Sequence, residues 1–167
     1  MLITRLLLAA VFVPMIVEAR LAATNERIQR ALGGIEPPGD VYRIMQVAYP
    51  GVFLAMIAEG AWQPGHEQLM IGAAIFVAAK ILKWSAILTL GPAWTFRVIV
   101  RPGMPLVTAG PYRWFRHPNY VGVVGELAGV ALMSGARVAG PLGTAFFVVL
   151  MLKRIRVEER ALSALGR

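Results

Sequence analysis

Three long apolar segments limit what this chain can fold into. They run roughly from Leu2 to Ala19, from Val41 to Ala61 and from Leu69 to Leu90. A helix needs about 20 apolar residues to cross a bilayer, and each segment is close to that length. The chain is 57% hydrophobic and only 16% charged, which is too apolar for an ordinary soluble domain of its length. We therefore predict an integral membrane protein.

Two shorter apolar blocks follow, from Tyr120 to Met133 and from Val138 to Leu152, joined by the sequence SGAR. Their length and tight connection predict a helical hairpin. The predicted fold is all-α: a polytopic membrane bundle of about five transmembrane helices that ends in this hairpin. We divide it into residues 1–90, with three spans, and residues 91–167, with a polar loop, the hairpin and a C-terminal helix.

The first segment has an alternative interpretation as a signal peptide. Arg5 precedes the apolar run, and small residues follow it in the sequence EARLAA. The later segments would keep the protein in the membrane in either case, and Pro14 is tolerated in a packed membrane helix. We therefore favour a first span.

The basic residues predict one orientation. Thirteen of the 17 lysines and arginines fall after the first span, in the long loop after the third span, or in the tail. They are Arg20, Arg27, Arg30 and Arg43; Arg97, Arg101, Arg113 and Arg116; and Lys153, Arg154, Arg156, Arg160 and Arg167. Because cytoplasmic loops carry such an excess of basic residues, we expect the N-terminus outside and the C-terminus in the cytoplasm. The membrane that we expect is the cytoplasmic membrane of a bacterium.

Other partners are not favoured by the composition. The formal net charge is +8, but it lies between apolar blocks, as expected beside anionic lipid rather than nucleic acid. The chain has no cysteine, and His66 and His117 lie far apart in the sequence. We therefore predict neither nucleic-acid binding nor a metal site.

The stretch GPYRWFRHPNY, residues 110–120, concentrates polar chemistry between apolar segments. Pro118 suits the first turn of a helix and keeps His117 extended just before it. The free backbone N–H groups of that helix start, with Arg113 and Arg116 nearby, would attract an anion. The alternative is a basic loop that contacts lipid through its aromatic residues.

Ionisable residues also occur inside or beside the predicted spans. Glu126 is a functional candidate because a charge in hydrocarbon is costly, although it could also serve as a structural partner for a basic residue. For Lys80 and Lys83 we favour snorkelling to the interface over a role in a site. Arg154 and Glu158, at i and i+4, can meet on one helix face, or belong to a solvated tail.

Three motifs in the second half carry a resemblance. LKWSAILTLGPAWTFRV, TAGPYRWFRHPNYVG and RIRVEERAL, in this order around an apolar hairpin, resemble the isoprenylcysteine carboxyl methyltransferase family and its phospholipid-methylating relatives. The resemblance covers roughly residues 80–162. It implies an S-adenosylmethionine-dependent methyltransferase that releases S-adenosylhomocysteine and has no Rossmann sheet. Gly122, Gly125 and Gly129 would then allow close helix packing instead of forming a nucleotide-binding loop.

The resemblance also implies roles for individual residues. The residues implied to hold the cofactor are Tyr112, Arg113, Arg116, His117, Pro118, Tyr120, Glu158 and Glu159. Arg154 and Glu158 resemble the pair beside the site of methyl transfer. To these we add Glu126 as a general base for a hydroxyl acceptor, because burial disfavours its charged form.

The acceptor is left open between several lipophilic molecules that reach the site from the bilayer. The sequence ends at ALSALGR, without the longer acidic and aromatic extension of the eukaryotic prenylcysteine enzymes. RHPNYxxxxxE instead resembles a bacterial branch that acts on alkyl-tailed phenols or pyrones. The alternatives are a prenylcysteine-like carboxylate, a phospholipid or a thiol, or a non-enzymatic membrane protein whose basic loop contacts lipid.

Overall fold

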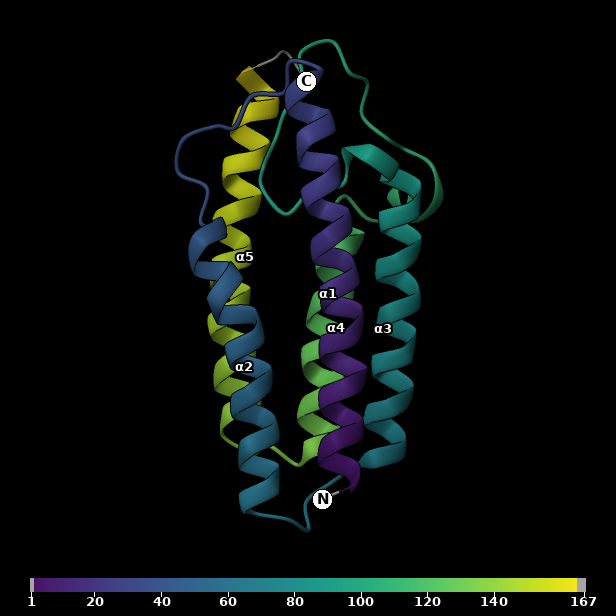
Figure 1. Cartoon of the computed structure of the whole chain (residues 1–167), viewed down its shortest axis with the longest axis vertical. Coiled ribbons are helices and arrows are strands. Elements are labelled where there is room, and N and C mark those ends of the chain that lie inside the picture. The colour runs from purple at the N-terminus through teal and green to yellow at the C-terminus, as the bar shows by residue number, and fades with distance from the viewer. Residues whose placement is uncertain (1, 165–167) are drawn as a thin grey trace.

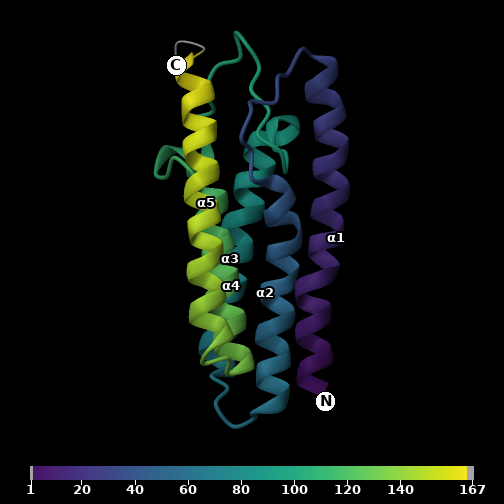
Figure 2. The ribbon, with the colours of Figure 1, turned by 90° about the vertical axis from the view of Figure 1, so that its left-hand side faces the viewer.

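The computed structural model describes residues 2–164 and contains five long helices and no strand in that range. The helices are α1 (Leu2–Ala31), α2 (Tyr42–Trp62), α3 (Leu69–Leu90), α4 (Pro118–Ser134) and α5 (Ala139–Ala164). Two short 3₁₀ helices, η1 (Gly91–Ala93) and η2 (Gly110–Arg113), lie in the long loop between α3 and α4. The helices run side by side as one bundle (Figures 1 and 2). The predicted all-α bundle is confirmed.

Three helices, α1, α2 and α3, are long and apolar enough to cross a membrane. The chain is therefore an integral membrane protein. Helix α4 has 17 residues and α5 has 26 with a charged C-terminal half, and both pack within the same bundle (Figure 2). The start of α1 and the end of α5 lie at opposite ends of the bundle, as an odd number of helices requires (Figure 1).

Helix boundaries follow the predicted spans with one clear difference. Helix α1 continues to Ala31, well beyond the predicted end at Ala19. Its second half is not apolar all round, but it packs on η1. The side-chain amide of Asn25 donates to the carbonyl oxygens of Gly91 and Trp94, and that of Gln29 donates to Pro92. Tertiary hydrogen bonds therefore support a helix that hydropathy alone ends earlier.

Helices α3 and α4 form the closest pair in the bundle, and glycines make this possible. A Cβ atom at Gly122 would lie 2.8 Å from Cβ of Lys83, and one at Gly129 would lie 2.8 Å from Cβ of Phe76. Both are shorter than real Cβ contacts. The prediction that these glycines serve helix packing is confirmed.

The connections separate into two ends (Figure 1). The short connections, residues 63–68 and 135–138, lie at one end. There the carboxylate of Glu59 accepts the backbone N–H groups of Arg137, Val138 and Ala139 and caps the start of α5. The long connections, residues 32–41 and 91–117, lie at the other end beside the C-terminal half of α5. They are joined by an antiparallel bridge between Ile35 and Val100.

Candidate active site

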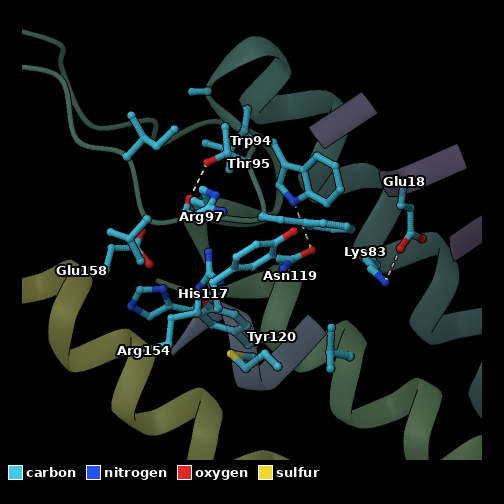
Figure 3. A pocket seen from close by; sticks show the side chains of 18 of the residues that line it. Glu18, Lys83, Trp94, Thr95, Arg97, His117, Asn119, Tyr120, Arg154 and Glu158 are labelled. Atoms are coloured by element: carbon cyan, nitrogen blue, oxygen red, sulfur yellow. Dashed lines mark hydrogen bonds and ion pairs between the residues drawn. The ribbon is translucent and has the colours of Figure 1, made fainter. Parts of the chain in front are cut away.

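A cavity of about 730 Å³ opens at the end of the bundle that carries the long connections. All five helices and the segments 93–99, 106–108 and 112–117 contribute to its lining. Its volume lies within the range of small-molecule sites. Figure 3 shows side chains from these segments converging on it.

The loop before α4 brings His117 to this cavity. Pro118 occupies the first turn of α4, and His117 is the residue before the helix, with φ of −132°. Nε2 of His117 lies 3.7 Å from Oε1 of Glu159, and Nη1 of Arg116 lies 3.6 Å from the same oxygen. The imidazole also packs on Tyr120, with ring centroids 5.6 Å apart. These contacts place the loop against α5.

Six of the eight residues implied to hold a cofactor line the cavity: Tyr112, Arg116, His117, Tyr120, Glu158 and Glu159. The other two do not. Arg113 is exposed, and its guanidinium lies 6.0 Å from the ring centroid of Trp114. Pro118 is buried within the first turn of α4. We therefore see Pro118 as fixing the direction of the helix start, and Arg113 as a surface residue.

Arg154 is a nearly buried cation on the cavity wall, at 7% exposure. Its Nη1 lies 4.0 Å from Oδ1 of Asp40, whose carboxylate also accepts the backbone N–H groups of Tyr42 and Val98. Nε of Arg154 is buried without a hydrogen-bond partner within the described residues. A buried donor without an acceptor is costly, so this atom is suited to a polar group of a ligand.

Glu158 lies one turn beyond Arg154 and is partly buried on the same wall. Burial raises the pKa of its carboxyl group, while the positive charges of His117 and Arg154 oppose that shift. Burial also raises the pKa of Tyr112. The site therefore places a carboxyl group of raised pKa beside a buried guanidinium.

Several lining residues were not predicted individually. Trp94 is 4% exposed, and its indole Nε1 lies 3.4 Å from Oδ1 of Asn119 (Figure 3). Both belong to motifs that carried the resemblance, so the motifs contained a signal for them. Asp40 lies in a loop with no motif, and only the folded structure brings it to Arg154.

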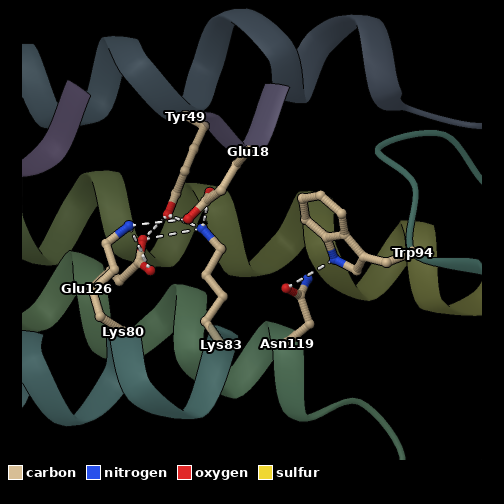
Figure 4. Close-up of polar contacts among 7 residues, drawn as sticks. All are labelled: Glu18, Tyr49, Lys80, Lys83, Trp94, Asn119 and Glu126. Atoms are coloured by element: carbon tan, nitrogen blue, oxygen red, sulfur yellow. Dashed lines mark hydrogen bonds and ion pairs between the residues drawn. The ribbon is translucent and has the colours of Figure 1, made fainter. Parts of the chain in front are cut away.

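Glu126 does not line the cavity but belongs to a buried group of charges (Figure 4). Lys80 Nζ lies 3.1 Å from its Oε1, and Lys83 Nζ lies 3.3 Å from its Oε2. The hydroxyl of Tyr49 donates to Oε2. Both lysines also contact Glu18 of α1, at 3.3 Å and 2.6 Å respectively.

The predicted snorkelling of Lys80 and Lys83 is therefore wrong. Their ammonium groups point into the bundle, and the side chain of Lys83 is only 3% exposed. The physical reason is that two carboxylates on α1 and α4 compensate their charge inside the bundle. Glu18 was missed because it lies at the predicted end of the first span, where a charge is ordinary.

These features define a helical membrane protein with a cavity of mixed charge at one end of its bundle. Residues 70–164 match the isoprenylcysteine carboxyl methyltransferase (ICMT) family, and the chain belongs to this family. Membership implies a membrane methyltransferase, as the sequence motifs predicted.

The chain is also similar to individual proteins. The chain is 35% identical to the protein YpbQ of Bacillus subtilis over 160 residues, which cover 94% of this chain and 95% of that protein. It is 25% identical to a Haemophilus influenzae protein over 148 residues, or 87% and 86% of the two chains. It is also 32% identical to the protein-S-isoprenylcysteine O-methyltransferase of Tribolium castaneum over 99 residues, or 58% and 35%.

Proposed function

We propose that the protein transfers a methyl group from S-adenosylmethionine to a lipophilic acceptor in the membrane. When bound, this cofactor supplies a methyl group activated by a sulfonium. It also carries a carboxylate, an amine and an adenine ring. The proposal is supported most directly by the buried Arg154 and the adjoining Glu158 on one wall of a cavity in an ICMT-family chain.

The cavity residues suit the groups of this cofactor. The unpartnered Nε of Arg154 and the imidazole of His117 are candidates to bind a carboxylate. Glu158 and Glu159 are candidates to bind the amine or the sulfonium, and a cation beside Glu158 would favour its ionised form. Trp94, Tyr112 and Tyr120 offer aromatic surface for the adenine.

The chain's own residues would contribute mainly orientation and exclusion of water. Methyl transfer requires an oxygen, sulfur or nitrogen nucleophile to be aligned with the methyl carbon. The acceptors we consider are a prenylcysteine-like carboxylate and the hydroxyl of an alkylphenol or pyrone, with a phospholipid or thiol as alternatives. The positive-inside pattern favours a cavity that opens to the cytoplasm.

Ligand binding gives the first test. S-adenosylhomocysteine should raise the unfolding temperature of the detergent-solubilised protein, because a ligand of the folded state stabilises it. Radiolabelled S-adenosylmethionine should then label an apolar product when the protein is incubated with a lipid extract. A non-enzymatic membrane protein whose basic loop only contacts lipid would show neither the shift in unfolding temperature nor the labelled product.

A further inference from the structure

The cavity lining contains a polar group of residues that the proposed cofactor contacts leave unused. Glu18 of α1, Tyr49 of α2 and Lys83 of α3 all line it. The lining also includes the apolar residues Met15, Met45, Val123 and Phe147. An apolar wall beside one polar cluster suits a lipophilic molecule with a small polar head.

The charges of this cluster cancel. It contains two carboxylates, Glu18 and Glu126, and two ammonium groups, Lys80 and Lys83, all in mutual contact. An anionic head group would add an uncompensated charge in a poorly solvated place, which is costly. A neutral head group that can both donate and accept hydrogen bonds would leave the charge balance of the cluster unchanged.

Among the cluster residues at the cavity, Glu18 has hydrogen-bonding capacity left. The ammonium of Lys83 has three N–H groups, and it lies within 2.6 Å of Glu18, 3.3 Å of Glu126 and 3.5 Å of the Tyr49 hydroxyl. The Tyr49 hydroxyl donates its hydrogen bond to Glu126. A carboxylate has about four lone-pair sites, whereas Glu18 receives bonds from two ammonium groups.

We propose that Glu18 is a catalytic residue that accepts the proton of a hydroxyl acceptor, while the positive charge of Lys83 favours the oxygen anion as it forms. This inference rests on the proposed function. The acceptor's O–H bond breaks and its proton moves to Glu18, while its oxygen forms a bond to the methyl carbon. The carbon–sulfur bond breaks, and its electron pair stays on sulfur as a thioether. Release of the proton from Glu18 to water restores the carboxylate.

Glu126 takes a different part in this scheme. It contacts the same lysines as Glu18 but does not line the cavity, so it is a positioning residue that holds Lys83 and Tyr49. The acceptor class is a phenol or enol that arrives protonated. A carboxylate acceptor, which arrives ionised, needs no proton acceptor.

The test compares Glu18→Gln with the matched variant Glu126→Gln, because each removes one negative charge from the same lysines. Two acceptors are used: an alkylphenol that is protonated in solution, and a nitro-substituted alkylphenol that is ionised before it binds. Glu18→Gln should slow methylation of the alkylphenol by roughly 10²-fold but should not slow methylation of the nitrophenol, whose anion is better compensated once one carboxylate is removed. Glu126→Gln should slow both to the same extent. Equal losses on both acceptors for Glu18→Gln, or no loss, would overturn the proposal.

A binding measurement tests the same contact without turnover. In the complex with S-adenosylhomocysteine, the absorbance of a bound alkyl-nitrophenol reports its ionisation. Glu18→Gln leaves the cluster with one excess positive charge and should lower the apparent pKa of the bound phenol. Lys83→Gln leaves one excess negative charge and should raise it. An unchanged value in both variants means that the head group does not reach the cluster, and overturns the proposal.

If Glu18→Gln does not fold, the pH profile of the wild type decides. With an internal proton acceptor, the rate at saturating alkylphenol does not follow the ionised fraction of the phenol between pH 6 and pH 8. Without one, it follows the ionised fraction of the phenol and rises about tenfold per pH unit, which overturns the proposal. Binding of S-adenosylhomocysteine without methylation of any alkylphenol overturns this inference alone. Failure to bind S-adenosylhomocysteine contradicts the proposed function itself.

Discussion

Asp40 and Arg154 face each other with an Oδ1 to Nη1 distance of 4.0 Å, and their side chains are only 4% and 9% exposed. They come from the α1–α2 loop and from α5, more than 110 positions apart in the chain. Asp40 also accepts the backbone N–H of Val98, at 2.8 Å. One carboxylate therefore joins α5, the loop after α1 and the loop after η1 around the candidate site.

Replacing Asp40 by Asn should destabilise the folded state by about 1–3 kcal/mol. The amide keeps the shape of the carboxylate, but its NH₂ group cannot accept a hydrogen bond and no longer compensates Arg154. Chemical unfolding in mild detergent measures the effect. Glu67→Gln is the control, because Glu67 is an exposed carboxylate in the 63–68 connection. Equal stability of the two variants would contradict a supporting role for Asp40.

His117→Ala should abolish binding of S-adenosylhomocysteine, whereas Arg113→Ala should keep it. Both residues belong to the same loop and carried the same predicted role. His117 lines the cavity and lies 3.7 Å from Glu159, while Arg113 is exposed outside it. Thermal shift with the ligand gives the affinities. A loss of affinity in Arg113→Ala would return this residue to the binding site.

Much of the fold is predictable from the sequence because hydropathy indicates where most of the long helices begin and end. The starts of α2 and α3 and the end of α3 match the apolar segments within one residue of the predicted bounds. The end of α1 does not, because Asn25 and Gln29 stabilise it through bonds to Gly91 and Pro92 of η1. Such contacts depend on where a distant segment lies, and no local pattern records them.

The candidate site, like the fold, was only partly predictable from the sequence. The loop residues His117 and Tyr120 lie in a motif that identifies them, and the structure brings them to the cavity. Glu18 and Asp40 lie in no motif, and their importance follows from the partners they meet, Lys83 and Arg154. Paired charges on separate helices become recognisable only after folding.

Gly129→Ala should lower stability by about 1–3 kcal/mol. The added methyl group would lie 2.8 Å from both Cβ and the backbone nitrogen of Phe76, so α3 and α4 must move apart. Gly51→Ala is the matched control within helix α2, where a Cβ atom meets nothing within 4 Å. It should be neutral or stabilising, because Ala favours helix over Gly. The two unfolding midpoints should move in opposite directions, or Gly51→Ala should not move at all.

Glu158→Gln should become increasingly stabilising, relative to wild type, as the pH rises. Burial raises the pKa of Glu158 in the folded protein, so folding favours its protonated form. The stability that this carboxyl contributes is complete below its unfolded pKa of about 4.3 and is lost as the pH rises through the folded value. Glutamine removes this loss. Unfolding temperatures of both proteins from pH 4 to pH 8, without ligand, measure it, and a constant difference would contradict the raised pKa.

The orientation of the bundle can be tested with reporters at its two ends. Thirteen of 17 basic residues follow the first span, lie in the loop after the third span or belong to the tail. The long connections and the C-terminal half of α5 share one end of the bundle (Figure 1), so the positive-inside rule applies to that end as a unit. A reporter fused after Arg167 should be active in the cytoplasm, and one inserted near Gly65 should be active outside.

Replacing Arg27, Arg30 and Arg43 by neutral residues should weaken this preference, because it removes positive charge from the expected cytoplasmic end. The connections at the opposite end contain one basic residue, Arg137, and its replacement is the control. The reverse reporter pattern would turn the cavity away from cytoplasmic S-adenosylmethionine and contradict the proposed function.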